Sequence, residues 1–310
     1  MAFDPKKFTD ESIEYIKKRI GNKKAIIALS GGVDSSVCAI LTNRAIDNKL
    51  ISVFVDTGFM RKDEPQMIKN LFEKKFHLNF KIVDARDEFF EAIRRIRDPE
   101  EKRKVMGKKF IDVFERIARK EKAQVLVQGT IAPDWIESDG KIKAHHNVGG
   151  LPSELNLEIV EPIRELYKDE VRILARSLEL PDEISERMPF PGPGLGVRVL
   201  GEVTPEKIEI VRNCDAIVKE EIEKSDIKSW QAFAALLEGK STGVKGDSRE
   251  YGYMIALRIV DSLDAMTANI KEVDWKILRK ISDRITREVP GVTRVLYDLT
   301  NKPPATIEFE

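Results

Sequence analysis

Cysteine, histidine and net charge are all scarce in this sequence. Its 310 residues include 2 cysteines and 3 histidines, and 53 basic side chains balance 53 acidic ones. Because Cys38 and Cys214 stand far apart and match no paired-cysteine motif, the sequence predicts neither a disulfide framework nor a cysteine-bound metal. A chain without excess positive charge has no general field that attracts nucleic acid. We therefore expect a protein of the reducing cytoplasm that does not bind nucleic acid.

Long apolar runs and a targeting signal are missing as well. No stretch reaches the roughly 18 apolar residues that span a bilayer, and residues 1–6 lack the pattern of a signal peptide. Hydrophobic residues nevertheless make up 42% of the chain, which is ample for a core. The length suits two domains. We expect a globular protein that does not contact membranes.

The most informative stretch is residues 25–36. Five apolar residues predict a short buried strand, which ends abruptly in the sequence Ser-Gly-Gly-Val-Asp-Ser-Ser at residues 30–36. Glycines let backbone N–H groups approach a phosphate, hydroxyls add donors, and a helix that begins near Asp34 points its positive end at the same place. An ordinary strand, turn and capped helix is the alternative, but it leaves the paired glycines unexplained. The stretch predicts a phosphate-binding loop, although it matches neither the Walker A nor the G-x-G-x-x-G pattern.

Strands alternate with helices through the first part of the chain. The pattern predicts strands at residues 50–55, 79–83 and 124–128, with helices between them. Such alternation requires crossover connections, and hence a doubly wound parallel sheet of the α/β class. Ligands of these sheets bind at the carboxyl ends of the strands. Because Asp34, Asp56 and Gly129 each lie just past a predicted strand, we expect them to share one crevice.

Two polar segments interrupt this pattern. Residues 98–104 combine a helix start with three successive cations, which predict either a solvated helix start or a mobile lid over a polyphosphate. Residues 130–158 are typical of a polar active-site loop. A zinc pair is disfavoured there, because adjacent histidines point in different directions on regular elements and no cysteine is nearby. The candidates for chemistry in the two segments are Lys102, Arg103, Lys104, Asp134, Lys143, His145 and His146.

The last third of the chain predicts a separate, smaller domain. Residues 188–198 are rich in proline and glycine and indicate a rigid connector. Beyond the connector, the pattern predicts helices at 205–223 and 272–288 and strands at 230–237, 251–260, 292–299 and 305–310. Together these elements would form a small α+β domain without a phosphate loop of its own. We place the domain boundary between residues 187 and 188.

Several strings resemble those of a known enzyme family. The loop at residues 30–36 resembles that of the N-type ATP pyrophosphatases, which cleave ATP between the α and β phosphates. Taken together, the strings at 54–58, 102–104, 128–138, 143–152, 189–195 and 302–310 resemble the ATP pyrophosphatase part of GMP synthetase. The resemblance implies an adenine nucleotide alpha hydrolase-like domain at 1–187. It also implies a domain at 188–310 that binds XMP and forms dimers.

The resemblance also implies a reaction and its residues. A GMP synthetase adenylates XMP with ATP, releases pyrophosphate, and lets ammonia displace AMP to give GMP. Mg²⁺ would be required, with Asp34 as its ligand, and Asp34 would join the polar-segment candidates in catalysis. The implied ATP-binding residues are Ser30, Gly31, Gly32, Val33, Asp34, Ser35, Ser36, Asp56 and Gly129. The implied XMP-binding residues are Arg86, Arg198, Gln231, Lys302, Thr306, Ile307 and Glu308.

The implied partners follow from the same resemblance. The sequence contains no G-x-C-x-G nucleophile motif, so we expect ammonia to come from a separate glutaminase subunit. Two chains would pair through the C-terminal domain. One alternative is another N-type ATP pyrophosphatase ligase such as NAD synthetase, although the strings at 189–195 and 302–310 do not belong to its pattern. The other alternative is a nucleotide-sensing dimer that binds ATP without turnover.

Overall fold

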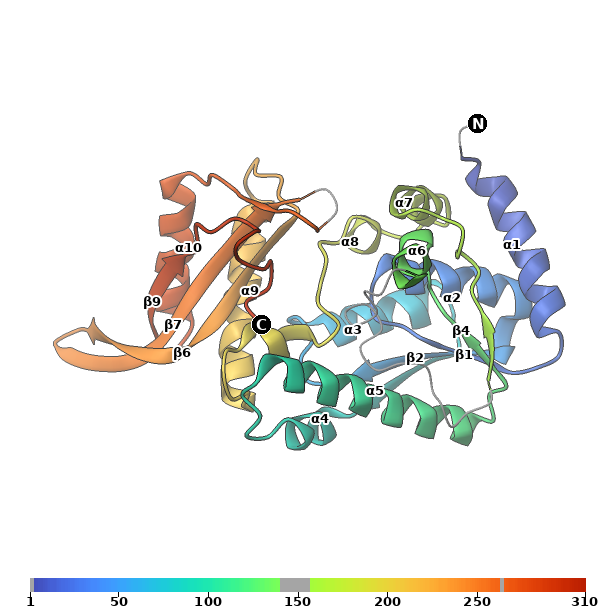
Figure 1. Cartoon of the computed structure of the whole chain (residues 1–310), viewed down its shortest axis with the longest axis horizontal. Coiled ribbons are helices and arrows are strands. Elements are labelled where there is room, and N and C mark those ends of the chain that lie inside the picture. Colours follow the sequence, from blue (N-terminus) through green and yellow to red (C-terminus); the bar gives the residue numbers. More distant parts are fainter. Residues whose placement is uncertain (1–2, 140–156, 263–264) are drawn as a thin grey trace. The chain divides into compact units, whose positions relative to one another are not determined.

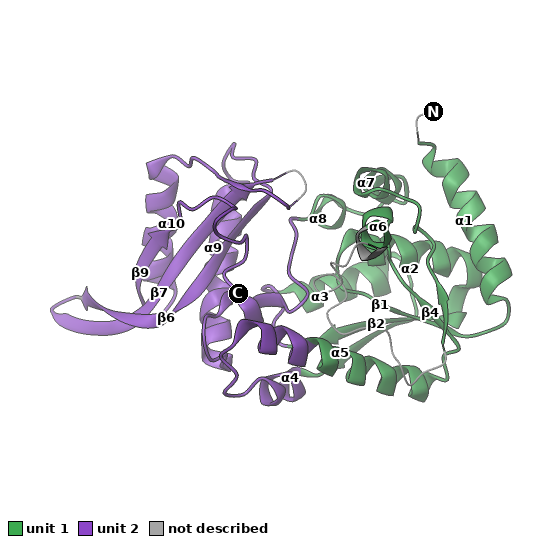
Figure 2. Ribbon diagram, viewed as in Figure 1, with its two compact units in different colours: residues 1–57, 63–85, 107–187 green, residues 58–62, 86–106, 188–310 purple. Residues whose placement is uncertain are grey.

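The computed structural model describes residues 3–139, 157–262 and 265–310 (Figure 1). These residues form two compact units (Figure 2). Unit 1 comprises residues 1–57, 63–85 and 107–187, and unit 2 comprises residues 58–62, 86–106 and 188–310. Two short segments from the first half of the chain therefore cluster with the last third. None of the described helices combines the length and the apolar character that a membrane crossing requires.

Unit 1 is built on a parallel sheet. Its described strands lie in the order β3-β2-β1-β4-β5, so that β1 is central. All neighbouring pairs are parallel, and Ile26 of β1 lies beside Ile51 of β2 and Leu126 of β4. The strands are β1 (Ala25–Ala28), β2 (Leu50–Asp56), β3 (Phe80–Asp84), β4 (Val125–Val127) and β5 (Glu158–Val160). The predicted doubly wound fold is confirmed in this arrangement.

The sheet lies between helices because β1 and β2 are apolar runs buried on both faces. On one face, α1 (Pro5–Ile20), α2 (Val33–Ile46) and α7 (Lys168–Ser177) pack against one another. In Figure 1, α5 (Pro99–Glu121) lies on the other side of the strands. Shorter segments complete the unit, namely α3 (Glu64–Lys69), α6 (Ala132–Asp139), α8 (Asp182–Ser185), a 3-10 turn (Asp47–Lys49) and a π-helical segment (Asn70–Lys75).

Unit 2 is organised around the long strand β7 (Ser248–Asp261). This strand pairs antiparallel with β6 (Gln231–Lys245) and β8 (Asn269–Ile270), and parallel with β9 (Val292–Tyr297). The two-residue turn between β6 and β7 begins with Gly246, whose φ of 60° suits the first position of a type II′ turn. The helices are α4 (Arg86–Ala92), α9 (Pro205–Glu223) and α10 (Trp275–Glu288), with a 3-10 turn at Gly194–Arg198.

One predicted strand of unit 2 is wrong. Residues 305–310, all of which the structure describes, form bends and irregular chain instead of a strand. Their main-chain oxygens bind side chains: Arg258 donates hydrogen bonds to the carbonyls of Thr306 and Ile307. An alternating sequence pattern predicts an extended chain, but it does not identify the hydrogen-bond partners of the backbone N–H and C=O groups. The predicted helix at 205–223 occurs with these bounds, and the remaining predicted elements of this unit occur with shifted ends; for example, β6 runs on to Lys245 and β9 ends at Tyr297.

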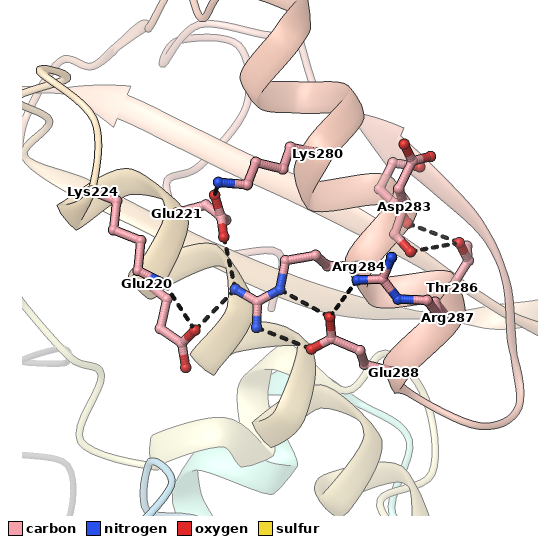
Figure 3. Close-up of polar contacts among 10 residues, drawn as sticks. Glu220, Glu221, Lys224, Lys280, Asp283, Arg284, Thr286, Arg287 and Glu288 are labelled. Atoms are coloured by element: carbon pink, nitrogen blue, oxygen red, sulfur yellow. Dashed lines mark hydrogen bonds and ion pairs between the residues drawn. The ribbon is translucent and has the colours of Figure 1, made fainter.

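A cluster of charged side chains joins α9 to α10 (Figure 3). Arg284 of α10 pairs with Glu220 at 2.9 Å and Glu221 at 2.8 Å, both on α9, and with Glu288 at 3.0 Å. Lys280 also pairs with Glu221 at 2.7 Å. Hydrogen bonds from Arg284 and then Arg287 lower the pKa of Glu288 from its ordinary 4.5 to about 2. The folded state therefore favours the charged form of this carboxylate.

We predict that Arg284→Met lowers the melting temperature by a few degrees, because Glu221 is almost fully buried and loses one of its two cations. The stabilisation linked to Glu288 is complete above pH 4.5 and is lost as the pH falls from 4.5 toward 2. Circular dichroism melts between pH 6 and 3 should therefore show a smaller loss on acidification in the variant than in the wild type. Arg279→Met, at an exposed position of the same helix, is the matched control. Equal effects of the two variants would contradict a specific role for Arg284.

Candidate active site

The Ser-Gly-Gly loop lies at the carboxyl end of β1 and leads directly into α2. Hydroxyl groups fix its shape: Ser30 Oγ and Ser35 Oγ are 3.1 Å apart, and Ser36 Oγ donates to the carbonyl of Gly32 at 2.7 Å. Within this fully described loop, Gly32 begins α2 without a side-chain cap. Because glycine has no side chain, the cap residue offers no side-chain acceptor to the first N–H groups of the helix. These groups lie at the positive end of the helix dipole. This arrangement suits an anion.

A lysine that sequence reasoning missed lies beside the loop. Lys168, the first residue of α7, donates to both carboxylate oxygens of Asp34, at 2.8 and 2.6 Å. The two side chains are 46% and 28% exposed, so the pair is open to solvent and to a ligand. No motif in the sequence predicts this contact. Strand β5 and the turn after it bring this lysine to the loop across 134 residues.

Arg187 stabilises the loop through a hydrogen bond to its backbone. Arg187 donates to the carbonyl of Gly31 at 2.9 Å and pairs with Glu64, which is almost fully buried. Gly31 has a φ of 75°, a left-handed conformation that favours glycine. A Cβ atom there would lie 2.7 Å from Nη1 of Arg187. The backbone conformation of Gly31 therefore favours glycine, and an added Cβ atom would also displace the end of the arginine side chain.

The predicted residues at neighbouring strand ends lie in the same unit. A Cβ atom on Gly129 would lie 3.1 Å from the backbone of Asp34 and Ser35, so the end of β4 packs directly on the loop. Asp56 ends β2, and its carbonyl accepts from Ala85 at 2.9 Å. Asp134 accepts from the backbone N–H of Ile131 at 3.0 Å. Asp134 thus stabilises the start of α6 in this conformation.

Cys38 lies on α2 near the loop but is not reactive. Burial raises the pKa of its thiol well above the ordinary value, and the negative charges of Asp34 and Glu161 raise it further. Its sulfur lies 3.7 Å from the carbonyl of Gln128. Because a thiolate is the nucleophilic form, Cys38 serves packing instead of catalysis.

Unit 2 holds a second polar cluster around Arg198. This arginine is buried; it binds both carboxylate oxygens of Glu308, at 3.0 and 3.1 Å, and Asp215 at 2.9 Å. Gln231 adds a hydrogen bond to Glu308 at 2.8 Å. Burial alone would lower the pKa of Arg198, but Glu308 and Asp215 raise it above its ordinary value. The guanidinium is therefore a permanent cation, which also lies over the ring of Phe233 at 4.2 Å.

The other residues predicted to bind XMP are spread around this cluster. Ile307 is buried and Thr306 is exposed. Lys302 donates to the carbonyl of Ala265 at 2.8 Å. Arg86 begins α4 and lies next to Gly58, where an added Cβ would be 3.2 Å from its Cγ. The structure thus brings Arg198, Gln231 and Glu308 into direct contact, whereas Lys302 and Arg86 lie outside that contact set.

The three cations predicted as a lid are not equivalent. Lys102 is fully buried, donates to the carbonyl of Val199 at 2.9 Å and pairs with Glu310. Burial lowers the pKa of Lys102, and the contact with Glu310 partly opposes this effect. Arg103 donates to the carbonyl of Glu310, while Lys104 is exposed. In this conformation, Lys102 and Arg103 are engaged within unit 2 and only Lys104 has the exposure that a cationic lid requires.

Three of the predicted catalytic residues, Lys143, His145 and His146, lie outside the described residues. Among the residues that are described, no group of three or more histidine, cysteine, aspartate or glutamate side chains could hold a metal ion. Asp34 is a partly exposed carboxylate of the loop, and both its oxygens face the Lys168 ammonium. Such a position suits a metal that takes most of its ligands from phosphates.

Two family models match different parts of the chain. The model described as "GMP synthase C terminal domain" matches residues 219–309, and the model described as "NAD synthase" matches residues 7–122. NMN synthetase from Francisella tularensis has a similar fold, with a TM-score of 0.51 and 15% identity over 74% of this chain and 90% of that one. This likeness concerns the fold alone.

Curated relatives match over nearly the whole chain, and each is described as one subunit of a glutamine-hydrolyzing GMP synthase. The relative from Methanopyrus kandleri is 66% identical, covering 99% of this chain and 100% of its own length. Those from Methanocaldococcus jannaschii and Pyrococcus furiosus are 62% and 61% identical, and cover 99% and 98% of the chain and 100% and 97% of their own lengths. The resemblance to GMP synthetase is thereby confirmed, and the chain belongs to the family of these GMP synthase subunits.

Proposed function

We propose that this chain makes GMP from XMP as the synthetase subunit of a GMP synthase, a ligase that forms a C–N bond. The observation that carries the proposal is the 66% identity to a GMP synthase subunit over 99% of the chain. The structure supports it with an uncapped, hydroxyl-rich loop before α2, which suits the polyphosphate of ATP. The NAD synthase model covers residues 7–122 only, so it does not favour the alternative ligase.

The loop residues would hold the pyrophosphate of ATP. The backbone N–H groups at the start of α2 and the hydroxyls of Ser30, Ser35 and Ser36 are donors that can turn toward an anion. Lys168 would supply the positive charge that a Walker lysine supplies in other ATP enzymes. Asp56 and Gly129 would line the same strand ends, and Gly129 lets β4 approach the loop closely. These donors would stabilise charge that develops on the departing pyrophosphate.

Asp34 would hold Mg²⁺ together with the phosphates of ATP. A magnesium ion keeps few protein ligands and takes the rest from phosphates and water, which fits a single carboxylate at the loop. The bound metal supplies Lewis-acid stabilisation of phosphate charge. Asp34 itself keeps the ammonium of Lys168 beside the loop through two hydrogen bonds. The negative charge of Asp34 would thereby hold two cations at the loop, the Lys168 ammonium and the metal ion.

The chemistry proceeds in two steps. The 2-oxo oxygen of XMP attacks the α-phosphorus of ATP, and the bond from that phosphorus to the bridging oxygen breaks, so that pyrophosphate leaves with the electron pair. Ammonia then adds at C2, the C2–O bond breaks, AMP leaves, and one proton is released. Activation is needed because an oxo group is a poor leaving group whereas AMP is a good one. Water must be kept from the adenylated intermediate, which would otherwise return to XMP.

XMP would bind to the cluster around Arg198. In xanthine, ring N–H groups are donors, and Glu308 is an acceptor that accepts three hydrogen bonds among the described contacts. Since a carboxylate has about four acceptor positions, Glu308 has room for a base N–H. Lys302 would meet the phosphate, with Arg86, Gln231, Thr306 and Ile307 as further contacts. Residues 188–310 would therefore form the XMP-binding domain, and pairing of two chains through it is part of the proposal.

Ammonia would come from a separate glutaminase subunit. The relatives that match this chain over its whole length are each described as one subunit of a glutamine-hydrolysing enzyme. A second subunit that hydrolyses glutamine fits that description. The cytoplasm, where ATP and XMP are available, is the compartment that suits such a reaction.

We predict that Asp34→Asn lowers XMP-dependent release of pyrophosphate by about 10²-fold or more, because the loop loses the charge that holds its cations. The fold should persist, since the side chain is 28% exposed. A coupled pyrophosphate assay measures the rate, and Asp10→Asn, at an exposed position of α1, is the control. Near-normal turnover of Asp34→Asn at ordinary Mg²⁺ concentration would remove Asp34 from the site.

We predict that the purified chain makes GMP with ammonium ions but not with glutamine. Chromatographic detection of GMP after incubation with ATP, Mg²⁺, XMP and either nitrogen source tests this directly. Addition of a glutaminase subunit should restore the use of glutamine. Production of GMP from glutamine by this chain alone would contradict the two-subunit assignment.

We predict that Glu308→Gln raises the KM for XMP about tenfold or more, because a charged acceptor for the base is lost. The KM for ATP should change little. Asp215→Asn is the matched variant, since Asp215 binds the same guanidinium at 2.9 Å. It should lower the melting temperature but change the KM for XMP less. If the two variants change that KM equally, Glu308 acts through Arg198 and not on the base.

A further inference from the structure

Residues 306–310 contain the proposed base-binding residue, Glu308, yet these described residues lie in no strand. The main-chain oxygens of an irregular segment have many ways to be satisfied, and most of them leave the segment free to move. Here, side chains from distant parts of unit 2 bind the segment at both ends. The question is what these contacts do for Glu308.

Arg258 binds the beginning of the segment. Its side chain is fully buried, and it donates to the carbonyl of Thr306 at 2.9 Å and to that of Ile307 at 3.3 Å. The same guanidinium pairs with Asp298 at 2.9 Å and donates to the carbonyl of Thr300. Arg258 comes from the central strand β7, so the segment is bound to the most extensively paired strand of the unit.

Lys102 binds the end of the segment. It is fully buried, pairs with the carboxylate of Glu310 and donates to the carbonyl of Val199 at 2.9 Å. The other carboxylate oxygen of Glu310 accepts from the backbone N–H of Gly201 at 2.9 Å. Arg103 donates to the main-chain carbonyl of Glu310. Both the side chain and the backbone of Glu310 are therefore fixed.

Movement of this segment would be costly because the two cations are buried. A buried charge that loses its partner destabilises the folded state far more than the loss of an exposed ion pair does. Displacement of residues 306–307 would break two hydrogen bonds of Arg258, and displacement of residue 310 would leave Lys102 without its carboxylate. Glu308 lies between these two fixed points.

We propose that Arg258 and Lys102 are positioning residues for XMP: they hold residues 306–310 at both ends and so present Glu308 to the purine base in a fixed orientation. The proposal rests on the proposed function, because it concerns the same substrate site. It assigns Lys102 to the substrate-binding segment of unit 2 and not to a lid. Preorganisation of this kind lowers the entropy lost on binding and keeps the substrate aligned for reaction.

The test compares three variants of the complete chain with ammonium ions as nitrogen source. Lys102→Met leaves Glu310 buried without its cation. The double variant Lys102→Met with Glu310→Met removes both charges, so that stability should recover while the segment stays unanchored. Lys108→Met, at an exposed position on the same helix, is the control. Melting temperature, the KM for XMP and the KM for ATP are measured for each.

We expect Lys102→Met to raise the KM for XMP about tenfold while the KM for ATP stays near the wild-type value. The double variant should regain melting temperature but keep the raised KM for XMP. If Lys102 has a purely structural role, the double variant should regain both the melting temperature and the wild-type KM for XMP. That result would overturn the proposal. If Lys102→Met does not fold, the double variant alone decides, since a wild-type KM for XMP contradicts the proposal and a raised one supports it.

Arg258→Lys gives an independent measurement at the other end of the segment. It keeps the positive charge but loses the forked geometry that binds two carbonyls at once. We expect the KM for XMP to rise about tenfold here too, and an unchanged value in a folded variant contradicts the role of Arg258. Failure of the wild-type chain to make GMP from XMP and ammonium would instead overturn the proposed function, so the two failures are distinguishable.

Discussion

Ion pairs with at least one buried partner set the arrangement of both candidate sites. In unit 1, Arg187 is paired with the buried Glu64 and in turn holds the carbonyl of Gly31 in the phosphate loop. In unit 2, Arg198 is shared between Asp215 and Glu308. A buried charge cannot be left unpaired without a large loss of stability, so each pair fixes the segment that carries its partner. The irregular segments of the two sites are thereby attached to side chains of helices, Glu64 of α3 and Asp215 of α9.

Most of the fold could be predicted from the sequence, because hydrophobic periodicity and turn residues are local signals. The apolar run at residues 25–29 and the glycines after it correctly placed β1, the loop and α2. Lys168 could not be found in this way, since its contact with Asp34 joins residues far apart in the chain. Pairing across that separation depends on the order of the strands, which local periodicity does not contain.

In the basic run at residues 102–104, the helical period distinguishes side chains that carry the same charge. Lys102 shares one face of α5 with Met106, which follows it by one helical turn, and Val113 and Ile117 continue that buried face. Helical period therefore places Lys102 on the apolar side, and Lys104 on the exposed side. Three adjacent cations suggested one shared role, but their positions around the helix separate them. The helical period does not show which carboxylate pairs with the buried Lys102.

Glu308 and Glu310 also differ in their partners although they lie close together in the sequence. Glu308 and Glu310 stand two residues apart in the segment 305–310, for which the sequence predicted a strand. The structure shows an irregular segment without strand pairing, in which each carboxylate binds a different buried cation, Arg198 or Lys102. Arg198 offers a planar fork that binds both oxygens of Glu308, whereas Lys102 binds one oxygen of Glu310 and leaves the other to Gly201. The choice of cation thus decides how firmly each carboxylate is oriented, and the more firmly oriented one is the residue assigned to the purine base.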